Sequence, residues 1–293
     1  MGTQAPAKDG EGEVFDIRRP AGPVAPLVLD SPHSGKVYPP DFRPAQPPQR
    51  YRRAEDMYVD ELFSSAPFLG VPLLKARFGR IYCDVNRASD DMDPEALDNA
   101  EGLELAPSAK AQLGKGVVWT ATPPDGAPLL VGPVRRTEYL DRLERCWHPY
   151  HAALGELIEE ARAGRRRVFH LDLHSMQPVA NAMHEDETGS LRPDIVLSDR
   201  EGASAGAGYL EAARTLLLEL GFSVAVNDPF KGAEILRRHG NPAQGVHSLQ
   251  IEVNRALYMD VESYGKTARF SETRARLSAF LVSLRDWAAK SGG

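Results

Sequence analysis

Short apolar runs, separated by longer stretches with helical periodicity, are the feature that most limits what this chain can fold into. Turn-forming residues bound each run, which is typical of short buried β-strands. Strands that alternate with helices favour a sheet covered by helices on both faces, because each helix has to bury one apolar side. The strands are predicted at residues 25–29, 72–76, 81–85, 168–173, 194–197, 222–226 and 249–253.

Three stretches between these runs carry apolar residues at spacings of three and four and are predicted to be helices. They are residues 137–163, which Pro149 is expected to kink, and residues 205–220 and 272–289. The expected fold is therefore a three-layer α/β/α sandwich around a mostly parallel, mixed sheet. Residues 21–293 are expected to form a single domain, and residues 1–20, rich in Gly, Pro, Ala and charge, a disordered segment. The Pro- and Gly-rich residues 92–133 are expected to form a lid or a substrate wall.

Charge and composition narrow the possible partners. The chain has 293 residues and a net charge of −6, without a basic patch that would indicate nucleic-acid binding. It has no apolar stretch long enough for a membrane span and no signal-peptide core, so we expect a cytoplasmic protein. The expected oligomeric state is a monomer or a homodimer. The two cysteines, Cys83 and Cys146, are interpreted as buried thiols in a reducing compartment.

Polar side chains follow four of the predicted strands. His33 comes after the first run, the pair Asn86-Arg87 after the run at 81–85, His174 after the run at 168–173, and Glu252 at the end of the last run. Open α/β sheets place their ligand sites at the carboxyl ends of the strands, so these groups are expected to converge.

This set of side chains suits a hydrolytic metal centre. Such a centre needs two or three imidazole or carboxylate ligands and an open position for water. His33 and His174 suit the metal, and Glu252 suits the base that takes the water proton. Asp172 lies two residues before His174 on the same strand face, so it is expected to orient that imidazole. The chain has no HExxH helix, no GxSxG elbow and no Gly-rich phosphate loop, which disfavours thermolysin-like, serine-hydrolase and nucleotide-dependent enzymes.

At these residues the sequence resembles the N-formylglutamate amidohydrolase family, which is related to the zinc carboxypeptidases. The matching motifs occur in family order and cover residues 25 to 260 approximately. They are Ser31-Pro32-His33-Ser34-Gly35, Phe78-Gly79-Arg80 with Asp84-Val85-Asn86-Arg87, Trp147-His148-Pro149-Tyr150, Leu171-Asp172-Leu173-His174-Ser175-Met176, Phe230-Lys231-Gly232, and His247-Ser248-Leu249-Gln250-Ile251-Glu252.

The resemblance implies a mixed eight-stranded sheet between helices, of the phosphorylase/hydrolase-like type, and a Zn²⁺ ion, with Mn²⁺ or Co²⁺ as alternatives. The implied ligands are His33, His174 and Asp56, with Glu55 as the alternative carboxylate. Glu252 would be the catalytic base and Arg80 a donor to the oxyanion. Asn86 and Arg87 would bind the α-carboxylate of the substrate, and Arg255 or Arg80 its side-chain carboxylate. Lys231 and His247 are further candidate substrate contacts, each with a purely structural alternative.

The implied reaction is zinc-dependent hydrolysis of N-formyl-L-glutamate to formate and L-glutamate, as in histidine degradation. Two departures from the family pattern, at Glu234 and at Asn254-Arg255, leave the accepted side chain open. The alternatives are a deacylase of another acidic N-acyl amino acid such as N-formylaspartate, a carboxypeptidase-like metallopeptidase, and a catalytically silent metal- or ligand-binding protein.

Overall fold

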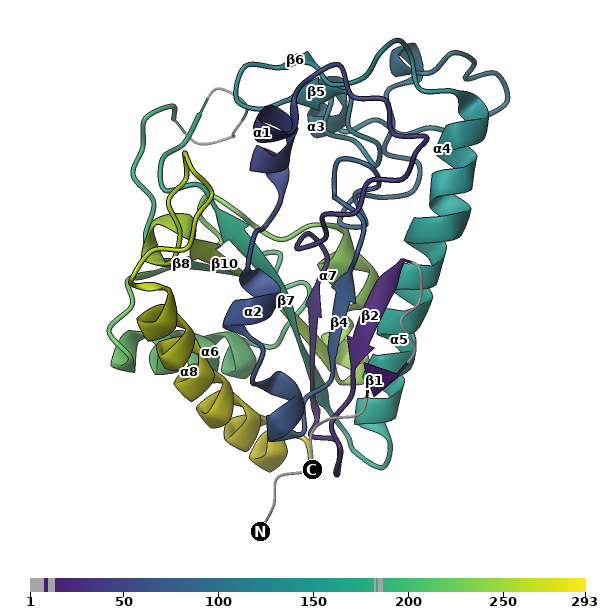
Figure 1. The fold of residues 1–293 in the computed structure, drawn as a ribbon. Helices are drawn as coiled ribbons and strands as arrows, with labels where there is room; N and C mark the ends of the chain where they lie inside the picture. Colours follow the sequence, from purple (N-terminus) through teal and green to yellow (C-terminus); the bar gives the residue numbers. More distant parts are fainter. Residues whose placement is uncertain (1–7, 10–13, 182, 184–186) are drawn as a thin grey trace.

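The structure is a computed structural model that describes residues 8–9, 14–181, 183 and 187–293. These residues form an eight-stranded sheet of order β1-β2-β4-β3-β7-β10-β8-β9 and a small two-stranded sheet, β5-β6 (Figure 1). In the large sheet, β4, β3, β7 and β10 run parallel to one another. The antiparallel pairs are β1 with β2, β2 with β4, and β10 with β8.

The elements have the following bounds. The strands are β1 (Lys8–Asp9), β2 (Phe15–Arg18), β3 (Leu27–Ser31), β4 (Leu73–Ala76), β5 (Ala121–Thr122), β6 (Ala127–Pro128), β7 (Val168–Met176), β8 (Ile195–Ser198), β9 (Val224–Val226) and β10 (Val246–Asn254). The α-helices are α1 (Pro48–Tyr51), α2 (Val59–Leu62), α3 (Ala109–Gln112), α4 (Arg136–Arg142), α5 (His148–Arg162), α6 (Ala207–Glu219), α7 (Glu234–His239) and α8 (Phe270–Ser291). Short 3₁₀ helices cover Arg52–Ala54, Ala66–Leu69, Pro94–Ala96, Pro242–Gln244 and Arg255–Leu257.

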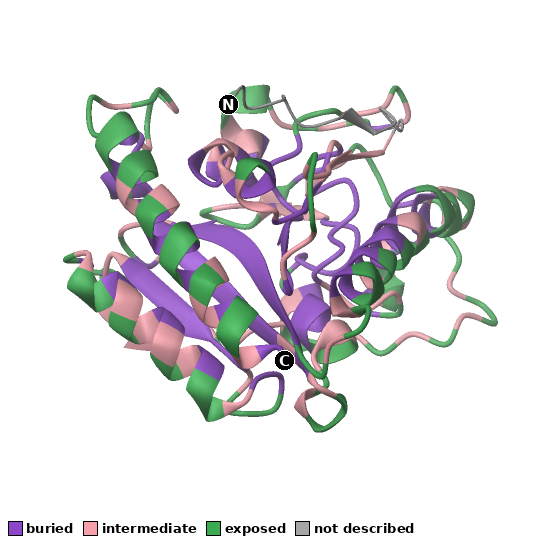
Figure 2. Ribbon diagram, turned by 90° about the horizontal axis from the view of Figure 1, so that it is seen from below, coloured by how far each residue is buried: buried purple, intermediate pink, exposed green. Residues whose placement is uncertain are grey.

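Two apolar cores lie on opposite faces of the sheet, as the alternation of side chains along a strand requires. In β3, Val28 belongs to the core under α5, whereas Leu27 and Leu29 belong to the core under α6 and α8. Figure 2 shows the buried sheet between helices whose outer faces are exposed. The three-layer α/β/α sandwich with a mostly parallel, mixed sheet is confirmed.

The predicted strand at residues 81–85 is wrong. Ile81, Cys83 and Val85 are fully buried, but the backbone here forms turns that start from Gly79. Its longer-range hydrogen bonds go to the loop before β5, from Asp84 N to Val117 O and from Trp119 N to Ile81 O. The apolar run therefore reflects burial under that loop, and periodicity alone does not distinguish such a segment from a buried strand.

The N-terminal segment also differs from the prediction of disorder through residue 20. Residues 1–7 and 10–13 lie outside the described part of the chain. Phe15–Arg18, however, forms β2, which pairs with β4, and Phe15 and Ile17 pack against the core under α5. The alternation of Phe15 and Ile17 with the charged Asp16 and Arg18 is the period of a strand with one buried face.

The predicted helix at residues 137–163 is present with an irregular middle. A π-helical segment, Leu143–Trp147, separates α4 from α5, and Pro149 lies in the first turn of α5. Proline lacks the N–H that would continue the regular ladder, which accounts for the irregularity at this point. None of the helices in the described residues has both the length and the apolar character needed to cross a bilayer.

Candidate metal and active site

Three segments far apart in sequence bring two imidazoles and a carboxylate together near the carboxyl ends of β3 and β7. His33 follows β3 by two residues, and His174 lies near the end of β7. Asp56 comes after the 3₁₀ turn Arg52–Ala54, and its backbone N–H donates to the carbonyl of His33 at 2.9 Å. This hydrogen bond joins the Asp56 segment to the end of β3.

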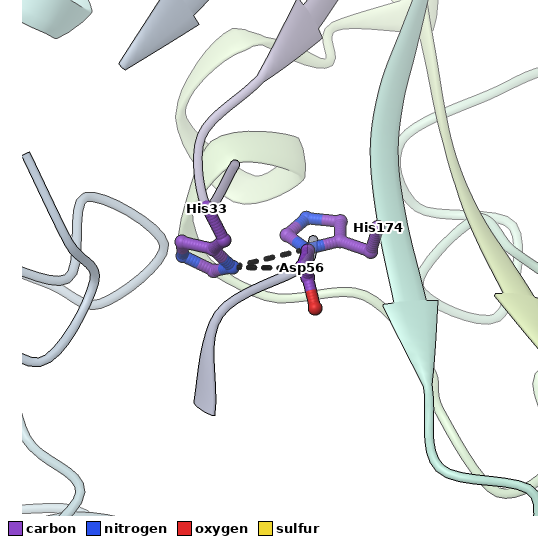
Figure 3. Close-up of side chains that lie close together, drawn as sticks. All are labelled: His33, Asp56 and His174. Carbon is purple, nitrogen blue, oxygen red and sulfur yellow. Dashed lines mark hydrogen bonds and ion pairs between the residues drawn. The ribbon is translucent and has the colours of Figure 1, made fainter. Parts of the chain in front are cut away.

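The ligand atoms of these three side chains face one another (Figure 3). His33 Nδ1 lies 3.1 Å from His174 Nδ1 and 3.3 Å from Asp56 Oδ2, and His174 Nδ1 lies 3.1 Å from Asp56 Oδ2. All three residues are buried. In a tetrahedral site with ligands about 2.0–2.1 Å from zinc, neighbouring ligand atoms are roughly 3.3–3.4 Å apart, so this spacing fits a metal.

The surroundings of the two imidazoles direct their lone pairs to the same point. His33 Nε2 lies 2.8 Å from Asp84 Oδ1, and His174 Nε2 lies 2.9 Å from Asp172 Oδ1. A carboxylate at Nε2 favours the proton on that nitrogen and leaves the lone pair on Nδ1. Two Nδ1 lone pairs only 3.1 Å apart repel each other unless a cation or a shared proton lies between them. The residues present therefore fit a divalent cation.

Asp56, and not Glu55, is the carboxylate of this cluster. The carboxylate of Glu55 accepts hydrogen bonds from Arg52 and from the hydroxyl of Tyr38, and it points away from the imidazoles. The other oxygen of Asp56, Oδ1, accepts from Ser175 Oγ and from Arg255 Nη2, each at 3.1 Å. Asp56 is thus held with one oxygen toward the imidazoles.

Glu252 lies beside the cluster. It is the register partner of His174 on the neighbouring strand β10, and its side chain is on the same face of the sheet. Its Oε1 accepts a hydrogen bond from Gln250 Nε2 at 2.8 Å. Burial raises the pKa of Glu252 to about 7, although the nearby His174 imidazole acts in the opposite direction. Glu252 is not one of the three clustered residues, and it lines the neighbouring cavity.

Arg80 reaches the site from the turn that holds Asp84. Its guanidinium donates to Asp84 Oδ2 at 3.0 Å and lies over the ring of Trp119. Burial alone would raise the pKa of Asp84, but the charge of Arg80 and the neighbouring His33 imidazole lower it well below its usual value. Asp84 therefore links Arg80 to the His33 imidazole as a carboxylate.

Asn86 and Arg87 line a cavity next to His174 and Glu252, and both also form hydrogen bonds within the protein. Asn86 Oδ1 accepts from Ile235 N, and its Nδ2 lies 3.2 Å from His174 Nε2. Arg87 donates to the carbonyls of Lys115 and Asn86, at 3.0 and 3.1 Å.

The remaining three predicted substrate contacts differ in position. Arg255 is buried in the cavity wall, where it donates to Ser175, Asp56 and two backbone carbonyls. Lys231 lies at the exposed rim and pairs with Glu201 at 2.8 Å. His247 is not brought to the site. It faces the α6 layer on the opposite side of the sheet from Glu252, where it stacks on Phe169 and accepts from Gly206 N.

This cavity, of about 390 Å³, is lined by His174, one member of the three-residue cluster, and by Glu252. Residues from the 92–133 segment form part of its wall, including Lys115 and Trp119, as predicted for that segment. Among the described lining residues, Glu252 is the one carboxylate, and it faces a set of cations. These are Arg53, Arg80, Arg87, Lys110, Lys115, Arg192, Lys231 and Arg255. Such a cavity favours an anionic ligand.

Three residues that were not predicted from the sequence contact the residues of this site. They are Asp84, Ser175 and Gln250, which hydrogen-bond His33, Asp56 and Glu252 respectively. Both Asp84 and Ser175 lie inside the family motifs: Asp84 comes two residues before Asn86, and Ser175 directly follows His174. Gln250 lies two residues before Glu252, so the two-residue period of a strand already places both side chains on one face.

Comparison with known proteins identifies the family of this chain. The family model described as N-formylglutamate amidohydrolase matches residues 25–259. The chain is 29% identical to an N-formylglutamate deformylase of Pseudomonas aeruginosa, over 94% of this chain and 97% of that protein. It is 26% identical to an N-formylglutamate deformylase of Pseudomonas putida, over 90% and 94% of the two chains.

A solved structure agrees with these sequence matches. The crystal structure of an N-formylglutamate amidohydrolase from Ralstonia eutropha superimposes with a TM-score of 0.90 at 36% identity, covering 98% of this chain and 100% of that one. The range matched by the family model, residues 25–259, contains His33, Asp56, His174 and Glu252. This chain is therefore an amidohydrolase that belongs to the N-formylglutamate amidohydrolase family.

Proposed function

We propose that this enzyme hydrolyses the formyl amide of N-formyl-L-glutamate to formate and L-glutamate, with a divalent cation held by His33, His174 and Asp56. Zinc is the first candidate for that cation, and manganese and cobalt are the alternatives. When bound, such a cation polarises the scissile carbonyl and lowers the pKa of a water molecule. The observation that carries the proposal is the cluster of three ligand atoms, 3.1–3.3 Å apart, beside an available glutamate in a cation-lined cavity.

Glu252 is assigned the proton transfers. Its carboxylate takes the proton of the attacking water, and it later delivers this proton to the departing amine nitrogen. A buried carboxylate whose pKa is raised to about 7 is suited to both steps, because it gains and loses a proton near neutral pH. A bound divalent cation would lower this pKa by its positive charge.

Arg80 is assigned the role of stabilising the negative charge that develops on the formyl oxygen. Its guanidinium lies in the cavity wall, and its contacts with Asp84 and Trp119 hold it in place. A fixed donor of this kind is worth about 3 kcal/mol when it is aimed at the oxyanion.

The charge of the cavity supports an acidic N-acyl amino acid as substrate. N-formyl-L-glutamate carries two carboxylates, and the cavity offers Arg87 together with several further cations. Arg87 is assigned the role of binding the α-carboxylate of the substrate, since a planar guanidinium forms two parallel hydrogen bonds with a carboxylate. Arg255 was predicted to bind the side-chain carboxylate. Its hydrogen bonds to Ser175 and Asp56 supply a competing role, in which it holds the metal-binding carboxylate.

Formate release from a small substrate panel tests the proposal. The zinc-loaded protein is assayed with N-formyl-L-glutamate, N-formyl-L-aspartate, N-formyl-L-glutamine, N-acetyl-L-glutamate and a glutamyl dipeptide, with formate or free amine as the readout. We expect N-formyl-L-glutamate to have the highest kcat/KM. The glutamine analogue should be much poorer, because it lacks the second negative charge that a cation-lined cavity attracts. A higher kcat/KM for N-formyl-L-aspartate or for the dipeptide would replace the proposed substrate, and no turnover of any compound would favour a silent binding protein.

The cytoplasmic location, the monomeric or homodimeric state and a place in histidine degradation stay predictions from the sequence and the family resemblance.

A further inference from the structure

We propose that Gln250 is a positioning residue for the reaction: its side-chain amide holds the Glu252 carboxylate in the orientation that proton transfer requires. This inference rests on the proposed function of Glu252 as the base and adds a residue to it.

The two side chains lie next to each other on one face of β10. Gln250 and Glu252 are separated by a single residue, and both are buried, with exposed fractions of 4% and 7%. Gln250 Nε2 donates to Glu252 Oε1 at 2.8 Å. Within the described part of the chain, this is the one hydrogen bond that the structure gives to the Glu252 carboxylate.

The direction of this hydrogen bond is determined by a backbone group further away. The N–H of Ile235 can only donate, and it donates to Asn86 Oδ1 at 2.9 Å. The Nδ2 of Asn86 therefore points the other way, where it donates to Gln250 Oε1 in a long hydrogen bond of 3.5 Å. Gln250 consequently presents its NH₂ group, and not its oxygen, to Glu252.

An amide donor at this position has two consequences for a general base. It occupies one carboxylate oxygen, Oε1, so that Oε2 remains for the water proton. It also restricts rotation of a side chain that otherwise has three free torsions, which matters because small misplacements of a catalytic group are costly. Since Gln250 is itself fixed at its other end by Asn86, the restriction extends back to the start of α7.

Two other roles for Gln250 have to be separated from this one. Gln250 also lines the cavity, so it could contact the substrate directly. It is also buried in the central strand β10, so its replacement could act only through stability.

The test compares wild type with Gln250→Met, which keeps the length of the side chain and removes the donor. Ser248→Ala is the matched control: Ser248 is buried on the same face of β10 and hydrogen-bonds His170, away from the cavity. We expect kcat for N-formyl-L-glutamate to fall by about 10- to 100-fold in Gln250→Met, because the base is misplaced. We expect KM and zinc affinity to change much less than kcat, because Gln250 itself forms no hydrogen bond with His33, Asp56 or His174. Ser248→Ala should lose stability but keep its kcat.

A double-mutant cycle with Glu252→Gln shows whether Gln250 acts through Glu252. If it does, Gln250→Met causes no further loss of kcat in the Glu252→Gln background. A raised KM with unchanged kcat would assign Gln250 to the substrate instead. An equal fall of kcat in Ser248→Ala would reduce its role to strand stability, and an unchanged kcat in Gln250→Met would overturn the proposal.

Crystal structures of wild type and Gln250→Met give a readout that does not depend on turnover. Wild type is expected to show a single Glu252 conformer within hydrogen-bonding distance of Gln250, whereas the variant is expected to show a rotated or multiple Glu252 side chain. An unmoved, single conformer in the variant would refute positioning by Gln250. A wild-type protein that turns over no acyl amino acid would refute the proposed function instead, and the structures would still decide the role of Gln250.

Discussion

Replacing Asp84 with asparagine keeps the shape of a fully buried side chain and removes its charge. In the structure, Asp84 Oδ1 lies 2.8 Å from His33 Nε2, while Oδ2 accepts from Arg80 at 3.0 Å and from Trp119 Nε1 at 3.1 Å. The carboxylate thereby fixes both the ring orientation and the tautomer of His33. The asparagine amide of the variant would instead be able to turn its NH₂ group toward the imidazole and favour the opposite tautomer.

The expected magnitude follows from these contacts. Loss of an outer carboxylate on a metal-binding imidazole typically weakens metal affinity by about 10- to 100-fold. That range corresponds to about 1.4–2.7 kcal/mol of binding free energy. The variant also leaves the guanidinium of Arg80 without its charged partner. Because Arg80 is partly open to the cavity, with 17% of its side chain exposed, we expect this loss of stability to lie below the roughly 3–5 kcal/mol typical of a broken buried pair.

The assay is a competition titration of zinc between the metal-free protein and a chromophoric chelator, at a temperature where the variant is folded. Asp41→Asn is the matched control. Asp41 is a partly buried aspartate near the same turn. It accepts from the hydroxyl of Tyr82 and approaches Arg142, but it contacts none of the three proposed ligands. We expect wild-type zinc affinity for Asp41→Asn. If Asp84→Asn also bound zinc as tightly as wild type, the assignment of His33 Nδ1 as a ligand oriented by Asp84 would be refuted.

Four further outcomes are expected from the same site. Glu252→Gln should retain zinc, measured by elemental analysis, and lose about 10³-fold or more in kcat, since general acid–base catalysis contributes 10²–10⁴-fold; near-normal turnover would remove Glu252 from the mechanism. His33→Ala should lose zinc, and an unchanged metal content would show the ligand set to be wrong. Arg87→Lys should lower kcat/KM for N-formyl-L-glutamate by about 10-fold or more, because an ammonium cannot replace a bidentate contact; an unaltered kcat/KM would refute the carboxylate clamp. The kcat/KM of wild type should fall as the pH drops, with an apparent pKa below about 7, because the base must be ionised and a bound cation lowers the burial-raised pKa of Glu252; a rate that rises toward acid pH would contradict the base.

The residues predicted from strand ends lie close together in the structure, because parallel strands deliver their carboxyl ends to one edge of a sheet. His33, His174 and Glu252 follow or end β3, β7 and β10, and the structure brings them together. Arg87 reaches the same cavity for a different reason. The segment before it, residues 81–85, was predicted to be a strand, but it forms buried turns that are held by backbone hydrogen bonds to the loop around Val117.

The carboxylate of the three-residue cluster could not be found from spacing. Asp56 and Glu55 are adjacent, and the family resemblance left both open. The structure separates them by local contacts: Arg52 and Tyr38 bind Glu55, while Ser175 and Arg255 bind the outer oxygen of Asp56. These contacts join the turn before α2 to β7 and to the turn after β10, and no pattern in one segment reveals such a meeting.

For His247, by contrast, the sequence pattern itself indicates that the side chain lies away from the site. His247 and Glu252 are five residues apart on one strand, so the two-residue period puts their side chains on opposite faces. The same count places Gln250 on the face of Glu252. Some cations of the cavity wall, such as Lys115 and Arg192, could not be predicted from the sequence. They lie on loops between the strands, and hydrophobic periodicity does not show the path of a loop.

Anomalous diffraction at the zinc absorption edge, from a crystal of the zinc-loaded protein, locates the ion itself. We expect a single strong peak within coordination distance of His33 Nδ1, His174 Nδ1 and Asp56 Oδ2, with the carboxylate of Glu252 outside the ligand set but facing the ion. A peak at another position, or one for which Glu252 replaces Asp56 as the carboxylate ligand, would contradict the proposed ligand set.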